Sequence, residues 1–302
     1  MKPLLLRPIP DKTIWGTDHI SKARGYDEPF GTWWEVSAHP YCTNEIINLP
    51  GETLQSVIDA DPENILGPGV TLHECLRLAW LDTKDRLSIQ VHPTDDNAPE
   101  NDYGKSESWY VLDAAPGATL VAGTNTTDAE TIRKSIEDGT LEDYLVHWPV
   151  KAGDFIYIPA GMLHALGKDI CAIEVGTNSN TTYRFYDYKR KGADGKERPL
   201  HLEESFKVTD FSLQPAFVPA SNEDHVLADA PQFTVVERFI NEPRTFTAGN
   251  SYFILSNMGE EIQFDYDGET ITLPKYSSVF VPRSAKEVTL PAGHVLESRP
   301  KL

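Results

Sequence analysis

The sequence predicts a mainly β protein built from two units, a larger one with helical additions and a smaller all-β one after it. Three observations support this expectation. Segments that alternate apolar and polar residues, or run apolar for a few positions, recur along the chain and end at Gly, Pro or Asp, as strands do. The 22 prolines and 20 glycines are scattered between these segments, which is typical of short strands joined by turns. A length of 302 residues is enough for two packed units.

The larger unit is expected to contain several strands and two helical stretches. Segments with strand patterns are TNEIINL (43–49), RLSIQVH (86–92), SWYVLDA (108–114) and DFIYIPA (154–160). Helical spacing of apolar residues appears at about 53–81, in TLQSVIDADPENILG and LHECLRLAW, and again at 127–145. In the second stretch Thr127 is a candidate N-cap with Glu130 three residues on, and Gly139 is a plausible stop. Charged residues around Gly192 and Gly195, including Asp194, then predict an exposed loop.

The smaller unit is expected to begin near residue 225 and to run to residue 302. Residues 212–231 are rich in Pro and Ala without a clear period, which predicts a linker. Strand patterns then follow, with Asp267-Gly268 as a strong hairpin signal. The stretch YSSVFVPRSAKEVTL resembles the earlier GDFIYIPAGMLHAL, with Glu287 at the place of His164, so this unit is a degenerate repeat or a chance likeness. Its only histidine after residue 232 is His294, and we expect no metal site there.

Charge and cysteine content narrow the possible partners and the compartment. The formal net charge of -19 should repel nucleic acid and anionic lipid, so neither is expected as a partner. An anionic substrate would need a local cluster of cations. The three cysteines, Cys42, Cys75 and Cys171, are widely spaced without a CxxC pair, which fits a reduced cytoplasmic protein without disulfides or a thiolate metal site. No stretch has the length of a signal peptide's apolar region or of a membrane span.

Four polar side chains are candidate metal ligands. Gln90 and His92 are two apart in a predicted strand and so share a face. Glu107 opens the next strand and can reach the same interior if the two strands are neighbours in a barrel, with His164 arriving from across the barrel. Two imidazoles, a carboxylate and an amide oxygen suit a divalent metal such as zinc. The alternatives are a hydrogen-bonded Gln90–His92 pair on a polar face and a half-buried histidine beside a hairpin.

Several motifs together resemble one known family. The spacing Gly153-x5-Pro159-x-Gly161-x2-His164 resembles the second signature of the cupin superfamily, and Gln-x-His with a later Glu resembles the first. Glutamine in that place, followed by Lys-x-Glu, is similar to type I mannose-6-phosphate isomerases of the short bacterial form. The likeness extends through WG at 15–16, GTWWEVSAHP at 31–40, SIQVHP at 88–93, GKSESWYVL at 104–112 and TTYRFYDYKR at 181–190.

The resemblance implies a fold, a cofactor and a ligand set. The fold would be a cupin jelly-roll barrel over residues 1–215 with the helical insertions, followed by a smaller β-barrel-like unit over 225–302. One Zn²⁺ per chain would be held by the ligands Gln90, His92, Glu107 and His164. The substrate would be a small sugar phosphate. The sequence leaves open whether the protein is a monomer or a homo-oligomer.

The resemblance also implies the reaction, the interconversion of mannose 6-phosphate and fructose 6-phosphate through an enediol(ate). Lys105 and Arg184 would be active-site cations that bind the substrate, and Glu174 would lie nearby on the segment AIEVG. One base must move the proton between C1 and C2, and a buried carboxylate is the natural candidate. This favours Glu174, with Lys105 as the second choice. Arg184 by itself could be either a fork for phosphate or a side chain with its head in water.

The chain departs from the family pattern at two places. Many members carry an aspartate four residues before the arginine, where this chain has Asn180, and glutamines after the glutamate of AIEVG, where it has Gly176 and Thr177. Neither change touches the expected metal ligands, and Asn180 is given no catalytic role. Two rival functions stay open: a non-catalytic sugar-phosphate-binding cupin and a metal-dependent cupin oxygenase.

Overall fold

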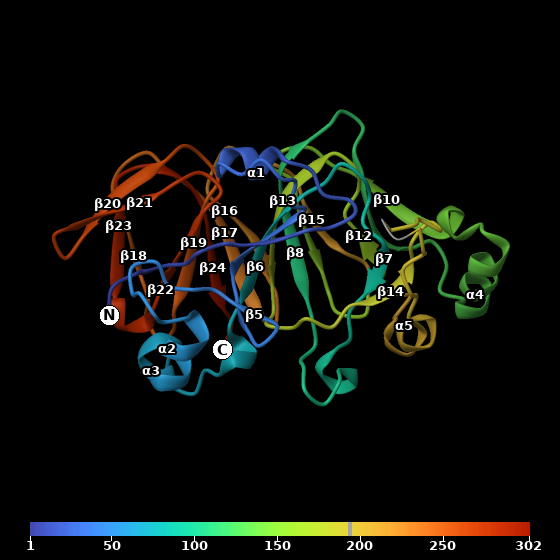
Figure 1. Ribbon diagram of the computed structural model, residues 1–302, viewed down its shortest axis with the longest axis horizontal. Coiled ribbons are helices and arrows are strands. Elements are labelled where there is room, and N and C mark those ends of the chain that lie inside the picture. The colour runs from blue at the N-terminus through green and yellow to red at the C-terminus, as the bar shows by residue number, and fades with distance from the viewer. Residues whose placement is uncertain (193–194) are drawn as a thin grey trace.

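The computed structural model describes residues 1–192 and 195–302, and it is built from layers of antiparallel sheet stacked along its long axis (Figure 1). The larger sheets of this described part have seven, five and six strands. The seven-stranded sheet lies in the middle, because one of its faces packs on the five-stranded sheet and the other on the six-stranded sheet. Two small hairpin sheets cover the far face of the six-stranded sheet.

The five- and seven-stranded sheets enclose one hydrophobic core between them. The seven-stranded sheet has the order β15-β11-β8-β13-β6-β3-β2, and the five-stranded sheet has the order β10-β9-β12-β7-β14. In the first of these, the strands are β2 Ile9–Asp11, β3 Thr32–Val36, β6 Arg77–Asp82, β8 Glu107–Ala114, β11 Phe155–Ile158, β13 Ile170–Gly176 and β15 Ala216–Val218. In the second they are β7 Ile89–Val91, β9 Thr119–Thr124, β10 Leu145–Pro149, β12 His164–Ala165 and β14 Tyr183–Tyr186.

The six-stranded sheet has the order β1-β22-β19-β24-β17-β16. Its strands are β1 Leu4–Leu5, β16 His225–Asp229, β17 Phe233–Ile240, β19 Phe253–Asn257, β22 Ser278–Val281 and β24 Gly293–Pro300. The paired strands of the small sheets are β4 Ala38–His39 with β5 Cys42–Thr43, β18 Arg244–Thr247 with β23 Glu287–Leu290, and β20 Ile262–Tyr266 with β21 Glu269–Leu273. The expected hairpin at Asp267-Gly268 is confirmed, with positive φ at both residues. Strand β1 comes from the N-terminus, so both ends of the chain contribute to this sheet.

The C-terminal half repeats the strand order of the first half. Strands β22, β23 and β24 begin at residues 278, 287 and 293, which is a constant offset from β11, β12 and β13 at 155, 164 and 170. The neighbours β11-β8-β13-β6 in one sheet correspond to β22-β19-β24-β17 in the other. Glu287 opens β23 as His164 opens β12. These correspondences support the internal repeat rather than a chance likeness.

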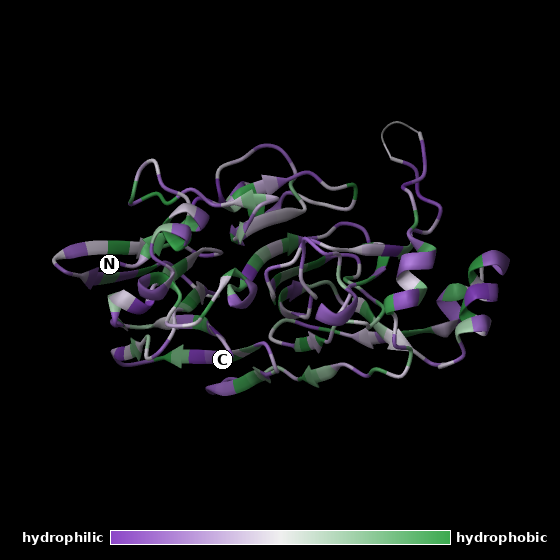
Figure 2. Ribbon diagram, turned by 90° about the horizontal axis from the view of Figure 1, so that it is seen from below, coloured by the Kyte–Doolittle hydropathy of each residue, from purple (hydrophilic) through white to green (hydrophobic). Residues whose placement is uncertain are grey.

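The helices are short and lie at the periphery. They are α1 His19–Ala23, α2 Leu54–Ala60, α3 Pro62–Ile65, α4 Ala129–Asp138 and α5 Leu202–Val208, with 3₁₀ turns η1 Leu72–Glu74, η2 Asp95–Asn97, η3 Leu141–Tyr144 and η4 Arg283–Ala285. Helices α4 and α5 cover one end, where hydrophobic and hydrophilic residues alternate along them (Figures 1 and 2). Helices α2 and α3 lie beside the C-terminal half, where Leu66 accepts a hydrogen bond from the Tyr252 amide. No helix in the described part is long and apolar enough to cross a membrane.

The prediction of a helix in LHECLRLAW, residues 72–80, is wrong. Only Leu72–Glu74 forms a 3₁₀ turn there, and Arg77–Asp82 is strand β6. Every residue of β6 is buried, because this strand has a packed sheet on each of its two faces. A strand buried on both faces shows a continuous apolar run instead of alternation, and such a run also fits a helical period.

Three smaller expectations need correction. Thr127 is not the N-cap of α4, because the Asp128 side chain accepts the hydrogen bond from the Glu130 amide, whereas Gly139 does end the helix with φ of 74°. TNEIINL contributes little strand beyond Thr43, since it makes only isolated bridges. The expected linker over 212–231 contains strands β15 and β16, both paired in sheets.

Of the loop expected around Gly192 and Gly195, Ala193 and Asp194 lie outside the described residues.

Candidate metal and active site

Three of the four expected metal ligands meet in the core between the five- and seven-stranded sheets. His92 follows β7, Glu107 opens β8 and His164 opens β12. His92 Nε2 lies 3.1 Å from Glu107 Oε2, and His164 Nε2 lies 3.1 Å from Glu107 Oε1. All three side chains are at most 1% exposed. The fourth, Gln90, places its amide nitrogen 3.4 Å from His164 Nε2.

The route by which these residues meet differs from the expectation. Strands β7 and β8 are not neighbours, because β7 belongs to the five-stranded sheet and β8 to the seven-stranded one. His164 does not come from across the core; it pairs directly with Gln90 in the five-stranded sheet. Glu107 is the residue that reaches across. The polar connection between β7 and β8 therefore changes sheets, which no local pattern in the sequence indicates.

The orientation of the two histidine rings suits metal binding. His92 Nδ1 donates to the carbonyl of Thr181 at 2.9 Å, and His164 Nδ1 donates to the carbonyl of Met162 at 2.8 Å. With Nδ1 used in this way, the Nε2 of each ring is the atom that faces the Glu107 carboxylate. Burial, followed by the charge of Lys105, lowers the pKa of His92 to about 4, so this ring is neutral near pH 7.

The chemistry of the cluster fits a divalent cation. His92 Nε2 and both oxygens of Glu107 are buried, and their close contacts are with one another, with His164 and with Lys105. Burial raises the pKa of Glu107, but Lys105 and the two histidines outweigh it and hold that pKa well below its usual range. Imidazole and carboxylate donors of this kind are ligands of zinc and similar ions. Carbonyl acceptors on both Nδ1 atoms are the outer partners that orient metal-bound imidazoles.

Lys105 connects this cluster to a second carboxylate. Its Nζ lies 2.7 Å from Glu107 Oε2 and 2.8 Å from Glu174 Oε1. Glu174 lies on β13, directly opposite Trp109 of β8, and its other oxygen accepts a hydrogen bond from Trp109 Nε1 at 3.3 Å. Burial lowers the pKa of Lys105, but the two carboxylates outweigh it and raise that pKa overall. The structure thus places an ammonium between the expected ligand Glu107 and the expected base Glu174.

Arg184 lies on the same sheet as the histidine ligands. Strand β14 pairs with β7 so that Arg184 stands opposite Gln90, which in turn stands opposite His164. Residues opposite one another in antiparallel strands project to the same face. The Arg184 guanidinium donates from Nη1 to the Pro199 carbonyl at 2.9 Å, and its buried Nε has no partner in the described part of the chain.

Two further arginines that the sequence reasoning missed lie close to Arg184. Burial lowers the pKa of Arg184, and the charges of Arg198 and Arg190 lower that pKa further. Both of these arginines bind the carboxylate of Asp187. Arg190 also pairs with Asp85, so three guanidiniums and two carboxylates form a group with net positive charge in a protein of net charge -19. The density of Lys and Arg in residues 184–198 was the available signal.

The two family departures have structural explanations. The Asn180 Oδ1 accepts a hydrogen bond from Arg77 Nη1 at 2.8 Å, and the backbone N–H of Asn180 donates to the Asp102 carboxylate. Asn180 therefore helps hold a buried arginine. Gly176 stands opposite Glu107, where a Cβ would lie 3.1 Å from the Ser106 carbonyl oxygen and 3.3 Å from Glu107 Cβ. A larger residue there would crowd the Ser106 carbonyl and the Cβ of Glu107.

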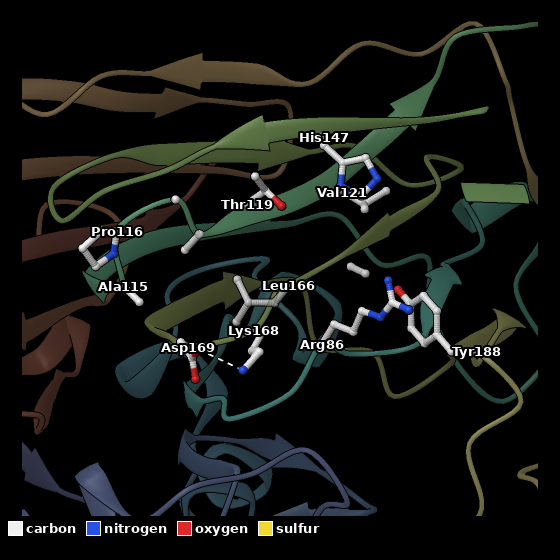
Figure 3. Close-up of a pocket in the computed structure, with 14 residues that line it drawn as sticks. Arg86, Ala115, Pro116, Thr119, Val121, His147, Leu166, Lys168, Asp169 and Tyr188 are labelled. Carbon is white, nitrogen blue, oxygen red and sulfur yellow. Dashed lines mark ion pairs between the residues drawn. The ribbon is translucent and has the colours of Figure 1, made fainter. Parts of the chain in front are cut away.

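A separate cavity of about 250 Å³ contains none of the expected site residues (Figure 3). Ala165 and Val121 line it, and since neighbouring residues of a strand point to opposite faces, this cavity lies on the other side of the sheet from His164. Its cations are already paired, Arg86 with Glu142 and Lys168 with Asp169. The catalytic candidates therefore remain Lys105, Glu174 and Arg184, and the candidate metal site remains the His92–Glu107–His164 cluster.

Comparisons of sequence identify similar proteins. The chain is 34% identical over 299 residues to a mannose-6-phosphate isomerase of Streptococcus mutans, covering 94% of each chain. It is 37% identical over 222 residues to a mannose-6-phosphate isomerase of Bacillus subtilis, covering 71% of this chain and 70% of that one. No protein-family model matches the chain.

Comparisons of structure agree. The crystal structure of the mannose 6-phosphate isomerase from Bacillus subtilis superposes with a TM-score of 0.85 at 28% identity, covering 99% of both chains. A phosphomannose isomerase from Salmonella typhimurium superposes with a TM-score of 0.78 at 15% identity, over all of both chains, and supports the fold alone. The predicted mainly β cupin fold is confirmed by these likenesses.

Proposed function

We propose, since the chain belongs to the mannose-6-phosphate isomerase family, that it is an aldose-ketose isomerase which interconverts mannose 6-phosphate and fructose 6-phosphate. The observation that carries this proposal is the juxtaposition at Lys105. Its ammonium lies between Glu107 of the His92–Glu107–His164 cluster and Glu174 on the neighbouring strand. A candidate metal site, a fixed cation and a second carboxylate are the parts that an enediol(ate) reaction needs within one small space.

The metal would be Zn²⁺, held by His92, Glu107 and His164. Gln90 would be the fourth ligand, with its amide turned so that Oε1 faces the cluster; nitrogen and oxygen of an amide are exchanged by a simple flip. When bound, such an ion supplies a fixed positive charge that polarises sugar oxygens. The carbonyls of Thr181 and Met162 hold the two imidazoles in the tautomer that this requires.

Glu174 would act as the base. Its carboxylate would take the proton from C2 of mannose 6-phosphate and return it to C1, while a proton moves between the two oxygens, so that aldose becomes ketose without loss of any atom. The Lys105 ammonium would stabilise the negative charge that develops on the enediolate oxygen. Trp109 Nε1 and Lys105 Nζ would orient the Glu174 carboxylate during the transfer. Lys105 as the base is the alternative.

Arg184 would bind the phosphate group. Its half-buried guanidinium is a planar fork suited to phosphate oxygens, and Arg190 and Arg198 add positive charge around it. The positive charge of these three arginines would allow a strongly acidic chain to bind a dianion.

A coupled assay for fructose 6-phosphate formed from mannose 6-phosphate tests the function. We expect turnover that a chelator abolishes and that added Zn²⁺ restores. Turnover should be equal with and without oxygen, which separates the isomerase from a cupin oxygenase. Tight binding of the sugar phosphate without any turnover would instead favour a non-catalytic binding protein.

Two variants separate the candidate bases. Glu174→Gln keeps the size and the hydrogen-bonding shape of the side chain but removes the base. We expect it to stop exchange of the C2 proton with deuterated solvent while leaving the bound metal in place. If Glu174→Gln still exchanged this proton and Lys105→Met did not, Lys105 would be the base.

A further inference from the structure

A second group of ligand atoms lies at the other end of the strands that carry the proposed active site. His19 opens α1, Asp82 ends β6 and Cys171 lies near the start of β13. The candidate ligand atoms of these three side chains all lie within 4.8 Å of one another. Cys171 pairs directly with Asp82, whereas the other end of β13, at Gly176, pairs with Glu107.

The group lies where the two halves of the molecule meet. Helix α1 lies near the middle of the long axis, between the two sets of sheets (Figure 1). Cys171 belongs to the core between the seven- and six-stranded sheets. The rings of His19 and of Tyr276, from the C-terminal half, pack edge to face with their centroids 5.7 Å apart. An ion bound here would join a helix and two strands at this boundary.

Two of the three candidate ligand side chains make no hydrogen bond in the described part of the chain. Within residues 1–192 and 195–302, the Cys171 thiol makes no hydrogen bond although it is only 4% exposed, and the His19 ring makes neither a hydrogen bond nor an ion pair. The other two cysteines differ, because Cys42 contacts the Ser37 hydroxyl and Cys75 the Leu76 carbonyl. Asp82 accepts a hydrogen bond from the Ile20 amide at 2.9 Å, which leaves lone pairs for a further ligand contact.

The electrostatics of this group favour a cation. Burial raises the pKa of Asp82 despite the backbone amides that it binds. Burial and the charges of Asp82 and Asp113 raise the pKa of the Cys171 thiol. Asp82 has no basic partner within salt-bridge distance in the described part of the chain, so its buried charge is compensated mainly by amide dipoles. A divalent ion would neutralise both the carboxylate and a thiolate.

We propose that His19, Asp82 and Cys171 form a second metal site for zinc or a similar borderline ion, separate from the isomerase site. Cys sulfur, His nitrogen and carboxylate oxygen are each zinc ligands, and water would fill a fourth position. Tetrahedral zinc separates its ligand atoms by about 3.3–3.6 Å, so the side chains need to close by roughly 1 Å. The exposed ring of His19 can make that movement. The Cys171 proton leaves on binding, so one proton is released per ion.

The test exploits a chemical difference between the two sites. The isomerase site offers nitrogen and oxygen only, whereas the proposed site offers sulfur. We therefore load the full chain with Co²⁺ and measure both the ions bound per chain and the near-ultraviolet charge-transfer absorption that only a thiolate ligand produces. We expect two ions per chain, with the thiolate band appearing together with one of them.

Variants assign the band to its ligands. Cys171→Ser should remove the band and one ion while isomerase activity stays unchanged, and Cys75→Ser is the matched control that keeps both. If the core position 171 does not tolerate serine, His19→Ala, on an exposed side chain, should weaken the second ion at least about tenfold, since even outer partners of metal ligands are worth 10–100-fold. The proposal is overturned if only one ion binds, if no thiolate band appears, or if the band survives in Cys171→Ser.

Discussion

His164 Nε2 lies 3.1 Å from Glu107 Oε1, although the strands that carry these residues belong to different sheets. The metal cluster therefore depends on how two sheets pack, and not only on the pairing of neighbouring strands. A change that shifts one sheet against the other should disturb metal binding even when every ligand is retained.

Replacing His164 by alanine tests the ligand set. We expect His164→Ala to lose one bound metal ion and the isomerase activity together, because the imidazole is buried and its Nε2 faces Glu107. Elemental analysis and the coupled assay measure the two effects. His147→Ala, on an exposed histidine of strand β10 in the same sheet, is the matched control and should change neither. Retention of the parent's full metal content in His164→Ala would show that His164 is not a ligand.

Replacing Arg184 by alanine tests the phosphate site. Hydrogen bonds to charged groups contribute roughly 1.5 to 3 kcal/mol each, so Arg184→Ala should lower kcat/KM for mannose 6-phosphate about ten- to a hundred-fold. Arg184→Lys should restore only part of this loss, since lysine lacks the planar fork. Arg133→Ala, which removes a surface guanidinium paired with Glu203, is the control.

Free mannose decides what Arg184 does, because it lacks the phosphate. If Arg184 binds phosphate alone, turnover of free mannose should be nearly equal in the parent and in Arg184→Ala. An equal slowing of both sugars would assign Arg184 to the chemical step instead.

Asn180 is expected to be a structural residue. Asn180→Asp restores the carboxylate that many family members carry, but here it would meet Arg77, whose Nη1 lies 2.8 Å from the present amide oxygen. The charged hydrogen bond should raise the thermal midpoint slightly and leave kcat within roughly twofold of the parent, as for substitutions outside the chemistry. A large gain in kcat would mean that the carboxylate is a missing part of the catalytic machinery.

The C-terminal half is expected to bind no metal. Glu287 stands where the repeat would place His164, and the ligand groups found in the described residues do not include any from residues 232–302. His294→Ala should therefore leave the metal content unchanged by elemental analysis. Loss of an ion from this variant would place a site in the tail.

A buried hydrogen bond should contribute to holding the halves together. The Tyr110 hydroxyl donates to Glu237 Oε1 at 2.6 Å, and these residues come from facing sheets. Tyr110→Phe leaves a buried carboxylate with one donor fewer, so the free energy of unfolding should fall by about 1.5 to 3 kcal/mol. Urea unfolding measures this, with Tyr41→Phe on a side chain that is 61% exposed as the control. An unchanged free energy of unfolding would show that this bond is not a determinant of stability.

Much of the candidate site could be predicted from the sequence because its signals are local. Gln90 and His92 are two apart, Lys105 and Glu107 are two apart, and the Pro-Ala-Gly turn before His164 has a fixed spacing. Each of these patterns constrains side chains through a few bonds of one backbone. The strands of the C-terminal half, with their exposed alternate residues, were readable for the same reason.

Only the tertiary structure decided the features that depend on contacts between segments distant in the sequence. Strand β6 carries a uniform apolar run because two sheets cover it, and a sequence cannot indicate whether one face or two will be covered. The spacing of the cysteines argued against a thiolate site, yet Cys171 meets Asp82 and His19, which come from two distant segments. The period of apolar residues indicates which side chains of a strand are buried. Which sheets meet depends instead on the path of the connecting segments and on packing. That physical difference separates the parts of this protein that its sequence determined from the parts that only the folded chain could decide.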